Sequence, residues 1–416
     1  MSDTHNPENK GREPLLDTTA HFGSRSDQTK SQADRSARYR QMVWAAPYVS
    51  EYAGLDRMWN CRDAAQSKVA GVDTVTSRYG DGPERAHYEG VQTCGYVKYC
   101  PCCARRIAET RRAEMNQLIA WARARGYTVQ MMTLTARHGA GDRLDDLVTG
   151  IKAAKRALHR HRAWGRTKPQ LVGYVTAFEI TGGGPHGWHP HFHVVIITRE
   201  PVDLDQLRDP WIASLRGQGL DGTGAGWKVQ DASSAGRYIA KWGIGEEVAL
   251  TDRKKAVRGG ATPFELLASA SDGDTRAKGL WIEYLRASPQ INVLRWSRGL
   301  KSLAEIGEVS DEDAAQDQAQ EEQVETGRAN IPHHPWKTRV ARRGGDRRAA
   351  LLDRAEEIGA EAAVAELLDA APDHDDIAEL LYEMDVAPVM IAGGLRERLA
   401  ASIAAREPPG RGPSYA

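Results

Sequence analysis

Three histidines occupy alternate positions just before an apolar run, namely His189, His191 and His193. Alternation at period two is typical of a β-strand, so the three imidazoles would project from one face, with Phe192 and Val194 on the other. Imidazoles two residues apart on a strand can converge on one divalent ion. Half-buried histidines at a sheet edge are the alternative, but three in this pattern favour a metal site.

A carboxylate is expected beside these histidines. Residues 171–180 have the composition of a strand, and the glycines and proline at 182–185 predict a turn into the histidine strand. An antiparallel hairpin would bring Glu179, near the end of the first strand, next to His191 and His193. A solvent-facing acid at a strand end is the other interpretation. We therefore expect a metal site made of Glu179, His191 and His193.

A tyrosine and a lysine further along the chain could supply a nucleophile. Residues 233–242 read as a helix capped by Ser233 or Ser234, which places Tyr238 and Lys241 on one face. A helical tyrosine is more often a packing residue. Beside a metal site, however, a phenol is a suitable nucleophile toward a phosphodiester that a divalent ion polarises and a nearby cation orients.

Four of the five cysteines lie within ten residues of one another. A Cys-Pro-x-Cys arrangement holds two thiolates close enough for one zinc ion, and two further thiolates would complete a tetrahedral structural site. Buried thiols without metal are the alternative, and Cys102 would be left over. The expected zinc ligands are Cys61, Cys94, Cys100 and Cys103.

Composition limits the class of protein. The 416 residues carry 56 Lys and Arg against 56 Asp and Glu, so the formal net charge is zero and a histone-like coating of nucleic acid is disfavoured. No apolar run is long enough to span a bilayer, and the N-terminus lacks a basic segment followed by an apolar one. We expect a cytoplasmic protein that does not bind membranes.

The chain divides by composition into segments. We expect an α+β fold with an antiparallel hairpin, preceded by a Cys-rich element and followed by helices. Arg105, Arg106 and Arg112 lie on a helix after the cysteines and could contact phosphates, although a solvated helix face is commoner. The expected segments are a disordered 1–40, a Cys-rich region with an Arg-rich helix at 41–125, a catalytic domain at 126–303, an acidic linker at 304–330 and a helical module with a tail at 331–416.

Taken together, these motifs resemble the HUH endonucleases, and among them the rolling-circle plasmid replication initiators. The resemblance covers about residues 55–305 and has the motifs in the family's order. It rests on His191-Phe192-His193 within His-Pro-His-Phe-His, Met132-Thr133-Leu134-Thr135, Tyr238-Ile239-Ala240-Lys241, the Cys94 to Cys103 segment, Thr262 to Leu267, Leu280-Trp281 with Tyr284, and Arg295 to Leu300.

The resemblance implies a fold and a mechanism. The fold is a central antiparallel sheet flanked by helices, as in RNA-recognition-motif sheets. His191 and His193, with Glu179, would hold Mg²⁺ or Mn²⁺. Tyr238 would attack a phosphodiester of single-stranded origin DNA, remain joined to the 5′-phosphate and free a 3′-hydroxyl, with Lys241 positioning the tyrosine or the phosphate. Implied partners are origin DNA, a host helicase and a DNA polymerase. The helicase must be another protein, because no P-loop motif occurs in the chain.

The chain departs from some initiators at one position and leaves alternatives open. Trp242 stands where some of them place a tyrosine, which assigns the nucleophile to Tyr238. A second cleavage would then need another nucleophile, another subunit, as in a homodimer, or water activated by a carboxylate, for which Glu246 and Glu247 are candidates. The following loop carries three expected DNA-backbone contacts, Arg253, Lys254 and Lys255.

Two other functions remain open. A relaxase or transposase of the same superfamily is one, because relaxases carry a three-histidine cluster and His189 would be the third member; here it is treated as a neighbour of the metal site or a base. A zinc-stabilised DNA-binding regulator without catalytic activity is the other.

Overall fold

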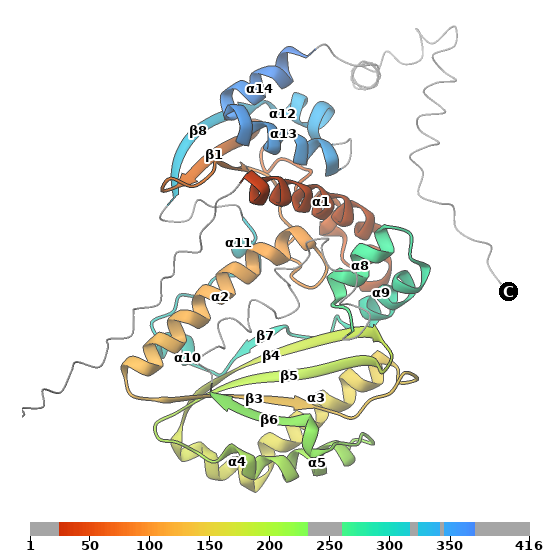
Figure 1. Cartoon of the computed structure of the whole chain (residues 1–416), viewed down its shortest axis with the longest axis vertical. Helices are drawn as coiled ribbons and strands as arrows, with labels where there is room; N and C mark the ends of the chain where they lie inside the picture. Colours follow the sequence, from red (N-terminus) through yellow and green to blue (C-terminus); the bar gives the residue numbers. More distant parts are fainter. Residues whose placement is uncertain (1–24, 232–259, 317–322, 342–344, 371–416) are drawn as a thin grey trace, which may run out of the picture.

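The structure is a computed structural model that describes residues 25–231, 260–316, 323–341 and 345–370. It has an α+β architecture with two antiparallel sheets (Figure 1). A five-stranded sheet lies in the lower half of this view, and a three-stranded sheet lies in the upper half, with helix α2 (Pro101–Ala124) between them. The expected central antiparallel sheet flanked by helices is confirmed.

The five-stranded sheet places the histidine strand at its centre. Its order is β6-β3-β5-β4-β7, and all neighbouring pairs are antiparallel. The predicted hairpin is present, but its first strand continues through the glycines to Gly184, so the turn consists of Pro185 and His186. Gly183 has a φ of +77°, which glycine adopts readily and which accommodates the irregular pairing there. The strands are β3 (Thr128–Thr135), β4 (Leu171–Gly184), β5 (Gly187–Thr198), β6 (Trp227–Asp231) and β7 (Leu294–Trp296).

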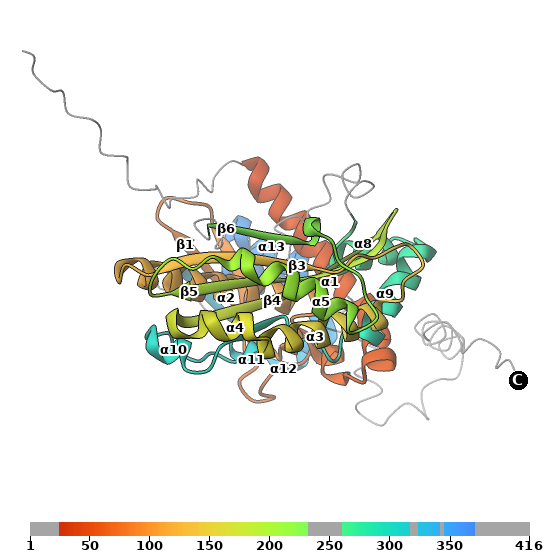
Figure 2. The same cartoon turned by 90° about the horizontal axis from the view of Figure 1, so that it is seen from below.

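Helices cover the two faces of this sheet differently. Helices α3 (Leu144–Arg160) and α4 (Arg162–Thr167) lie along the same side of the sheet in the view from below (Figure 2). They share an apolar core with Phe192 and Val194, the side chains predicted to point away from the histidines. On the opposite face α2 packs against Val195. Because side chains alternate along a strand, His193 and His191 follow on the face that α2 covers.

The three-stranded sheet joins segments that are far apart in the chain. Its order is β2-β1-β8, with β1 (Val72–Tyr79) between β2 (Arg85–Glu89) and β8 (Gln323–Ile331). Residues 323–330 were expected to belong to an acidic linker, and this expectation is wrong. They pair with β1 from Val72–Ile331 to Tyr79–Gln323. Local composition could not reveal a partner strand about 250 residues earlier.

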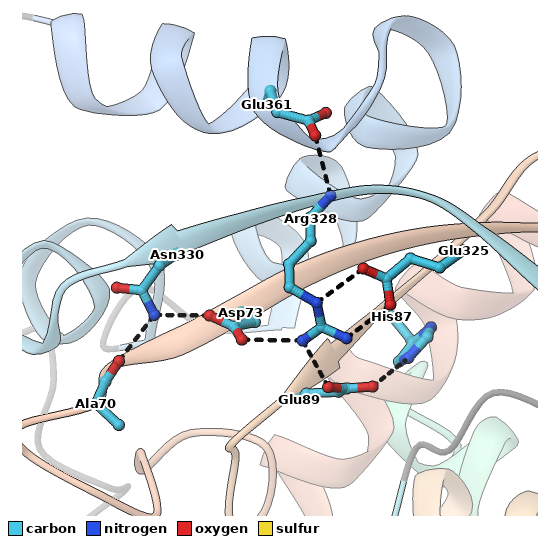
Figure 3. Close-up of polar contacts among 8 residues, drawn as sticks. All are labelled: Ala70, Asp73, His87, Glu89, Glu325, Arg328, Asn330 and Glu361. Atoms are coloured by element: carbon cyan, nitrogen blue, oxygen red, sulfur yellow. Dashed lines mark hydrogen bonds and ion pairs between the residues drawn. The ribbon is translucent and has the colours of Figure 1, made fainter.

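Ion pairs on one face of this sheet hold β8 in place (Figure 3). The Arg328 guanidinium binds Glu89 at 2.7 Å on β2 and Asp73 at 3.0 Å on β1, so it joins all three strands. Glu325, on the same strand as Arg328, lies 2.8 Å from it. Asn330 adds bonds to Asp73 and to the carbonyl oxygen of Ala70. Glu325, one of the acids that suggested a solvated linker, therefore pairs with the arginine that joins the three strands.

The N-terminal segment is also ordered further than expected. Helix α1 (Arg25–Ala53) begins at residue 25, so the prediction of disorder through residue 40 is wrong for residues 25–40, and residues 1–24 lie outside the described part. The Arg35 guanidinium forms ion pairs with Asp353 and Glu356 of helix α13 (Gly345–Ile358). A polar segment without a core of its own is thus packed against a helix more than 300 residues later.

Replacing Arg35 by methionine should lower the free energy of unfolding by about 3–5 kcal/mol, because the fully buried Glu356 side chain would lose its counter-charge. Arg40→Gln is the matched control. Its partner Asp346 lies 2.7 Å away, but both side chains are more than half exposed, so the loss should be below about 1 kcal/mol. Urea unfolding measures both. Equal losses would contradict the account.

The remaining elements complete the two halves. Helix α8 starts with a capping box in which the Thr262 hydroxyl accepts from the Glu265 amide and the Glu265 carboxylate accepts from the Thr262 amide. Within the described ranges, no helix is both long and apolar enough to cross a bilayer. The other helices are α5 (Arg208–Arg216), α8 (Pro263–Ser271), α9 (Thr275–Ala287), α10 (Leu300–Leu303), α11 (Asp311–Ala314), α12 (His333–Pro335) and α14 (Ala360–Asp369), with short 3-10 turns at 56–60, 168–170, 204–207 and 224–226 and a π-turn at 336–341.

Candidate metal centre

Strand pairing brings Glu179, His191 and His193 together. Glu179 of β4 stands directly opposite His191 of β5 in the register. Its Oε2 lies 3.3 Å from Nε2 of His191 and 3.3 Å from Nε2 of His193, and the two Nε2 atoms are 3.1 Å apart. The imidazoles are buried and the carboxylate is mostly so. The three side chains predicted as ligands thus direct one atom each to a common point.

The outer nitrogens of both rings are fixed by neighbours. Nδ1 of His191 lies 3.3 Å from the carbonyl oxygen of His189. A carbonyl only accepts, so Nδ1 carries the proton and the Nε2 of a neutral ring has a lone pair for the centre. Nδ1 of His193 lies 3.1 Å from the Thr133 hydroxyl, which can accept in the same way. Thr133, which the sequence indicated only as part of the Met132 to Thr135 motif, therefore orients the His193 ring.

The charge of Glu179 suits a cation. Burial by itself would raise the pKa of this carboxyl, but the His191 and His193 imidazoles, which donate hydrogen bonds to it and carry a positive charge when they are protonated at both nitrogens, lower the pKa to about 2. The carboxylate is therefore ionised at neutral pH. One carboxylate oxygen and two imidazole nitrogens are a donor set for a divalent ion, and it suits Mg²⁺, Mn²⁺ or Zn²⁺ without distinguishing them.

His189 lies beside this centre. Its Nδ1 is 2.6 Å from Nε2 of His138, whose Nδ1 donates to the carbonyl oxygen of His186 at 2.9 Å. Burial, followed by the charges of His191 and His138, lowers the pKa of His189 to about 4. His138 follows a strand in a loop, where no periodic pattern marked it, so sequence reasoning missed it.

Four cysteines form a second cluster. The Cys61 Sγ lies 3.7 Å from that of Cys100 and 3.5 Å from that of Cys103, and Cys94 is 3.6 Å from Cys103. All four are buried, and Cys102 lies outside the group. Hydrogen bonds from the other three thiols hold the pKa of Cys103 well below its ordinary range. The four thiols fit a structural zinc element, as predicted, and helix α2 begins within them.

The remaining predicted residues lie elsewhere. Arg105 and Arg106, in the first turns of α2, both face Glu109, at 3.3 Å and 3.6 Å. Arg112 lies further along the same helix. Outside the described residues are the predicted nucleophile and its neighbours, namely Tyr238, Lys241, Glu246, Glu247, Arg253, Lys254 and Lys255.

Comparison with known proteins finds a family model that matches the residues around this site. Residues 86–201 match the sequence model of a family described as replication protein. This part of the chain is similar to the replication-protein family. Glu179, His191 and His193 all fall within the matched residues, as do three of the four clustered cysteines. The resemblance to replication initiators is confirmed.

Two curated relatives are similar to the chain. One, named Protein rep, from Streptomyces lividans, is 30% identical over 291 residues, which cover 51% of this chain and 64% of the relative. The other, named Neomycin resistance protein, from Streptomyces cyanogenus, is 29% identical over 135 residues, covering 26% of this chain and 31% of the relative. The chain thus spans less than two thirds of the length of either relative. No solved structure matches it.

Proposed function

We propose that this protein is a plasmid replication initiator, a metal-dependent endonuclease that nicks one strand of origin DNA and remains covalently joined to it. The observation that carries the proposal is the convergence of Glu179, His191 and His193 within the residues that match the replication-protein family. Three acceptor atoms buried at one point call for a cation, and a divalent ion suits the chemistry of a phosphodiester.

The proposed reaction assigns a role to each residue. Glu179, His191 and His193 hold Mg²⁺ or Mn²⁺, which when bound polarises the scissile phosphate. The Tyr238 phenol loses its proton, and its oxygen attacks the phosphorus. The new bond joins Tyr238 to the 5′-phosphate, while the bond to the 3′ oxygen breaks and that oxygen takes up a proton from solvent, in place of the one that the phenol released, to leave as a 3′-hydroxyl. Lys241 orients the tyrosine or the phosphate.

This scheme explains how one protein could both start and end replication. The freed 3′-hydroxyl primes synthesis by a host polymerase, with strand separation by a host helicase. The phosphotyrosine bond stores the energy of the broken phosphodiester, so the strand can be rejoined without a nucleotide cofactor. Termination requires a second cleavage, for which Glu246, Glu247 or another copy of the chain are candidates.

The test is covalent capture of a labelled single-stranded oligonucleotide that contains the origin nick site. With Mn²⁺ we expect a protein–DNA adduct that survives denaturing electrophoresis, and with EDTA we expect none. His191→Ala should reduce the adduct at least about 10³-fold, because the ion contributes several kcal/mol to the transition state. His161→Asn, which changes an exposed histidine that caps a helix into another good capping residue, is the control.

Failure of this test has a defined meaning. If no adduct forms with any divalent ion while DNA binding persists, the nickase is contradicted and a zinc-stabilised DNA-binding regulator takes its place. If an adduct forms but the nicked sequence does not support plasmid replication, a relaxase or transposase is the better assignment.

A further inference from the structure

A group of hydrogen-bond donors with no acceptor in the described part of the chain lies on the other face of β4 from the metal centre. Lys155 of α3 places its Nζ 5.6 Å from the ring centroid of Tyr174 and 5.4 Å from that of Phe192. Side chains alternate along a strand, so Thr176 shares one face of β4 with Tyr174 and Phe178 and lies between them. Phe178 stands opposite Phe192 in the register. The ammonium group is therefore above Thr176.

Two buried polar atoms in this group lack a hydrogen-bond partner among the described residues, namely Oγ1 of Thr176 and Nε2 of His159. The His159 ring is held in place by stacking on Trp164, with centroids 4.2 Å apart and planes at 7°, and its centroid is 5.3 Å from that of Tyr174. Buried polar atoms are nearly always paired in folded proteins, so two unpaired ones at one place indicate a ligand or solvent that accepts their bonds.

The charges around these atoms are positive. Arg295 of the edge strand β7 stands opposite Thr176 in the register, and its side chain is exposed. Within the described part of the chain, neither Lys155 nor Arg295 forms an ion pair with a carboxylate. Burial and then the charge of Arg295 lower the pKa of Lys155 to about 8. Burial and the charges of Lys155, Arg295 and Lys168 lower the pKa of His159 to about 3.

We infer that Lys155, Thr176, His159 and Arg295 form an anion site that binds a phosphate group. The oxygens of one phosphate group can together accept from the ammonium, the hydroxyl, an imidazole N–H and the guanidinium, which would satisfy the unpaired donors of the cluster. If the proposed function holds, on which this assignment rests, the phosphate belongs to the backbone of the bound single strand. Thr176 precedes Glu179 by three residues, so the site is about 10 Å along β4 from the metal centre, on the other side of the sheet.

The test compares variants that differ in one charge. Lys155→Met removes the charge but keeps a long side chain over the two rings, and Lys155→Arg keeps the charge. Lys68→Met is the matched control, because it removes the same charge from an exposed position in the Cys-rich region. Affinity for a fluorescein-labelled single-stranded oligonucleotide is measured in EDTA at several salt concentrations, so that cleavage plays no part. Calorimetry with inorganic phosphate on each variant identifies the source of the anion.

We expect Lys155→Met to weaken oligonucleotide binding about tenfold and to reduce the slope of log K against log salt by about 0.7, the value for one phosphate contact on a single strand. Lys155→Arg should restore most of the binding, and Lys68→Met should match the wild type. Thr176→Val should weaken binding without lowering the melting temperature, since the buried hydroxyl has no hydrogen-bond partner among the residues that the structure describes.

Other outcomes overturn the inference in separable ways. Equal affinities and equal salt slopes for Lys155→Met and Lys68→Met, without a difference in phosphate binding, would exclude the anion site. Loss of inorganic phosphate binding with unchanged oligonucleotide binding would keep the anion site but exclude DNA as its ligand. Because the assay contains no divalent ion, failure of the nicking reaction would leave these results unaffected.

Discussion

Replacing Tyr238 by phenylalanine is expected to abolish the covalent protein–DNA adduct. The substitution removes one oxygen, the atom proposed to attack the phosphorus, and keeps the ring. No other group of the proposed centre can form the bond, since Glu179, His191 and His193 are committed to the cation through the atoms that converge on it. The loss should be complete within detection, because without a nucleophile there is no covalent product at all.

Measurements of Mn²⁺ binding and of DNA binding distinguish the loss of the nucleophile from a loss of folding. Tyr238→Phe should bind Mn²⁺ as the wild type does, because the three converging atoms are unchanged, and should still retain the oligonucleotide. Tyr48→Phe is the control for loss of a phenol hydroxyl at a half-buried position on α1. Persistence of the adduct in Tyr238→Phe would assign the nucleophile to another residue.

Loss of the zinc element should have the largest effect on stability. Structural zinc contributes about 10–16 kcal/mol in small domains, so Cys61→Ser should remove the metal and much of the order around it. The damage should extend beyond the cysteines. The carbonyl oxygen of Arg62 accepts from Arg348 of α13 at 2.8 Å, and the Arg62 guanidinium donates to the carbonyl oxygen of Ala315 at 3.1 Å. The residue next to Cys61 thus links the cluster to the C-terminal part of the chain.

Cys102 supplies the control for this prediction. It is a buried cysteine of the same segment, but it lies outside the four-cysteine group. Cys102→Ser should retain one zinc ion per chain by elemental analysis and melt within a few degrees of the wild type. Cys61→Ser should lose the zinc and melt far lower. Zinc retained in Cys61→Ser, or lost in Cys102→Ser, would show that the ligand set is different.

Helix α2 connects the four-cysteine cluster to the sheet that carries Glu179, His191 and His193. Cys100 is its N-cap residue and Cys103 lies in its first turn, while Leu118 and Ala122 near its other end pack on the five-stranded sheet. The face that they cover is the one that carries His193 further along β5. A helix whose first turn lies in the four-cysteine cluster therefore helps to hold the sheet face that carries His191 and His193.

Some of this architecture could be predicted from the sequence because the signals are local. Period-two alternation gave the faces of β5, and the strong turn signal before it gave the hairpin, which together placed Glu179 opposite His191. The cysteine cluster followed from residue type and a tetrahedral requirement, including Cys61, whose distance in sequence is bridged by the fold.

The failures concern contacts between distant segments. The start of α1 was predicted to be disordered and most of β8 to belong to an acidic linker, because their stabilising partners, α13 and β1, are more than 240 residues away. His138 and the Lys155 cluster were missed for the same reason. Their neighbours come from other strands and helices, so no spacing within one segment marks them.

The most direct measurement is anomalous diffraction from a crystal of the protein soaked in Mn²⁺. The account predicts one strong peak about 2.0–2.3 Å from Oε2 of Glu179, Nε2 of His191 and Nε2 of His193, which is lost in His193→Ala. Absence of a peak at this point, in a crystal of protein that forms the DNA adduct with Mn²⁺ in solution, would contradict the metal centre and the proposed reaction with it.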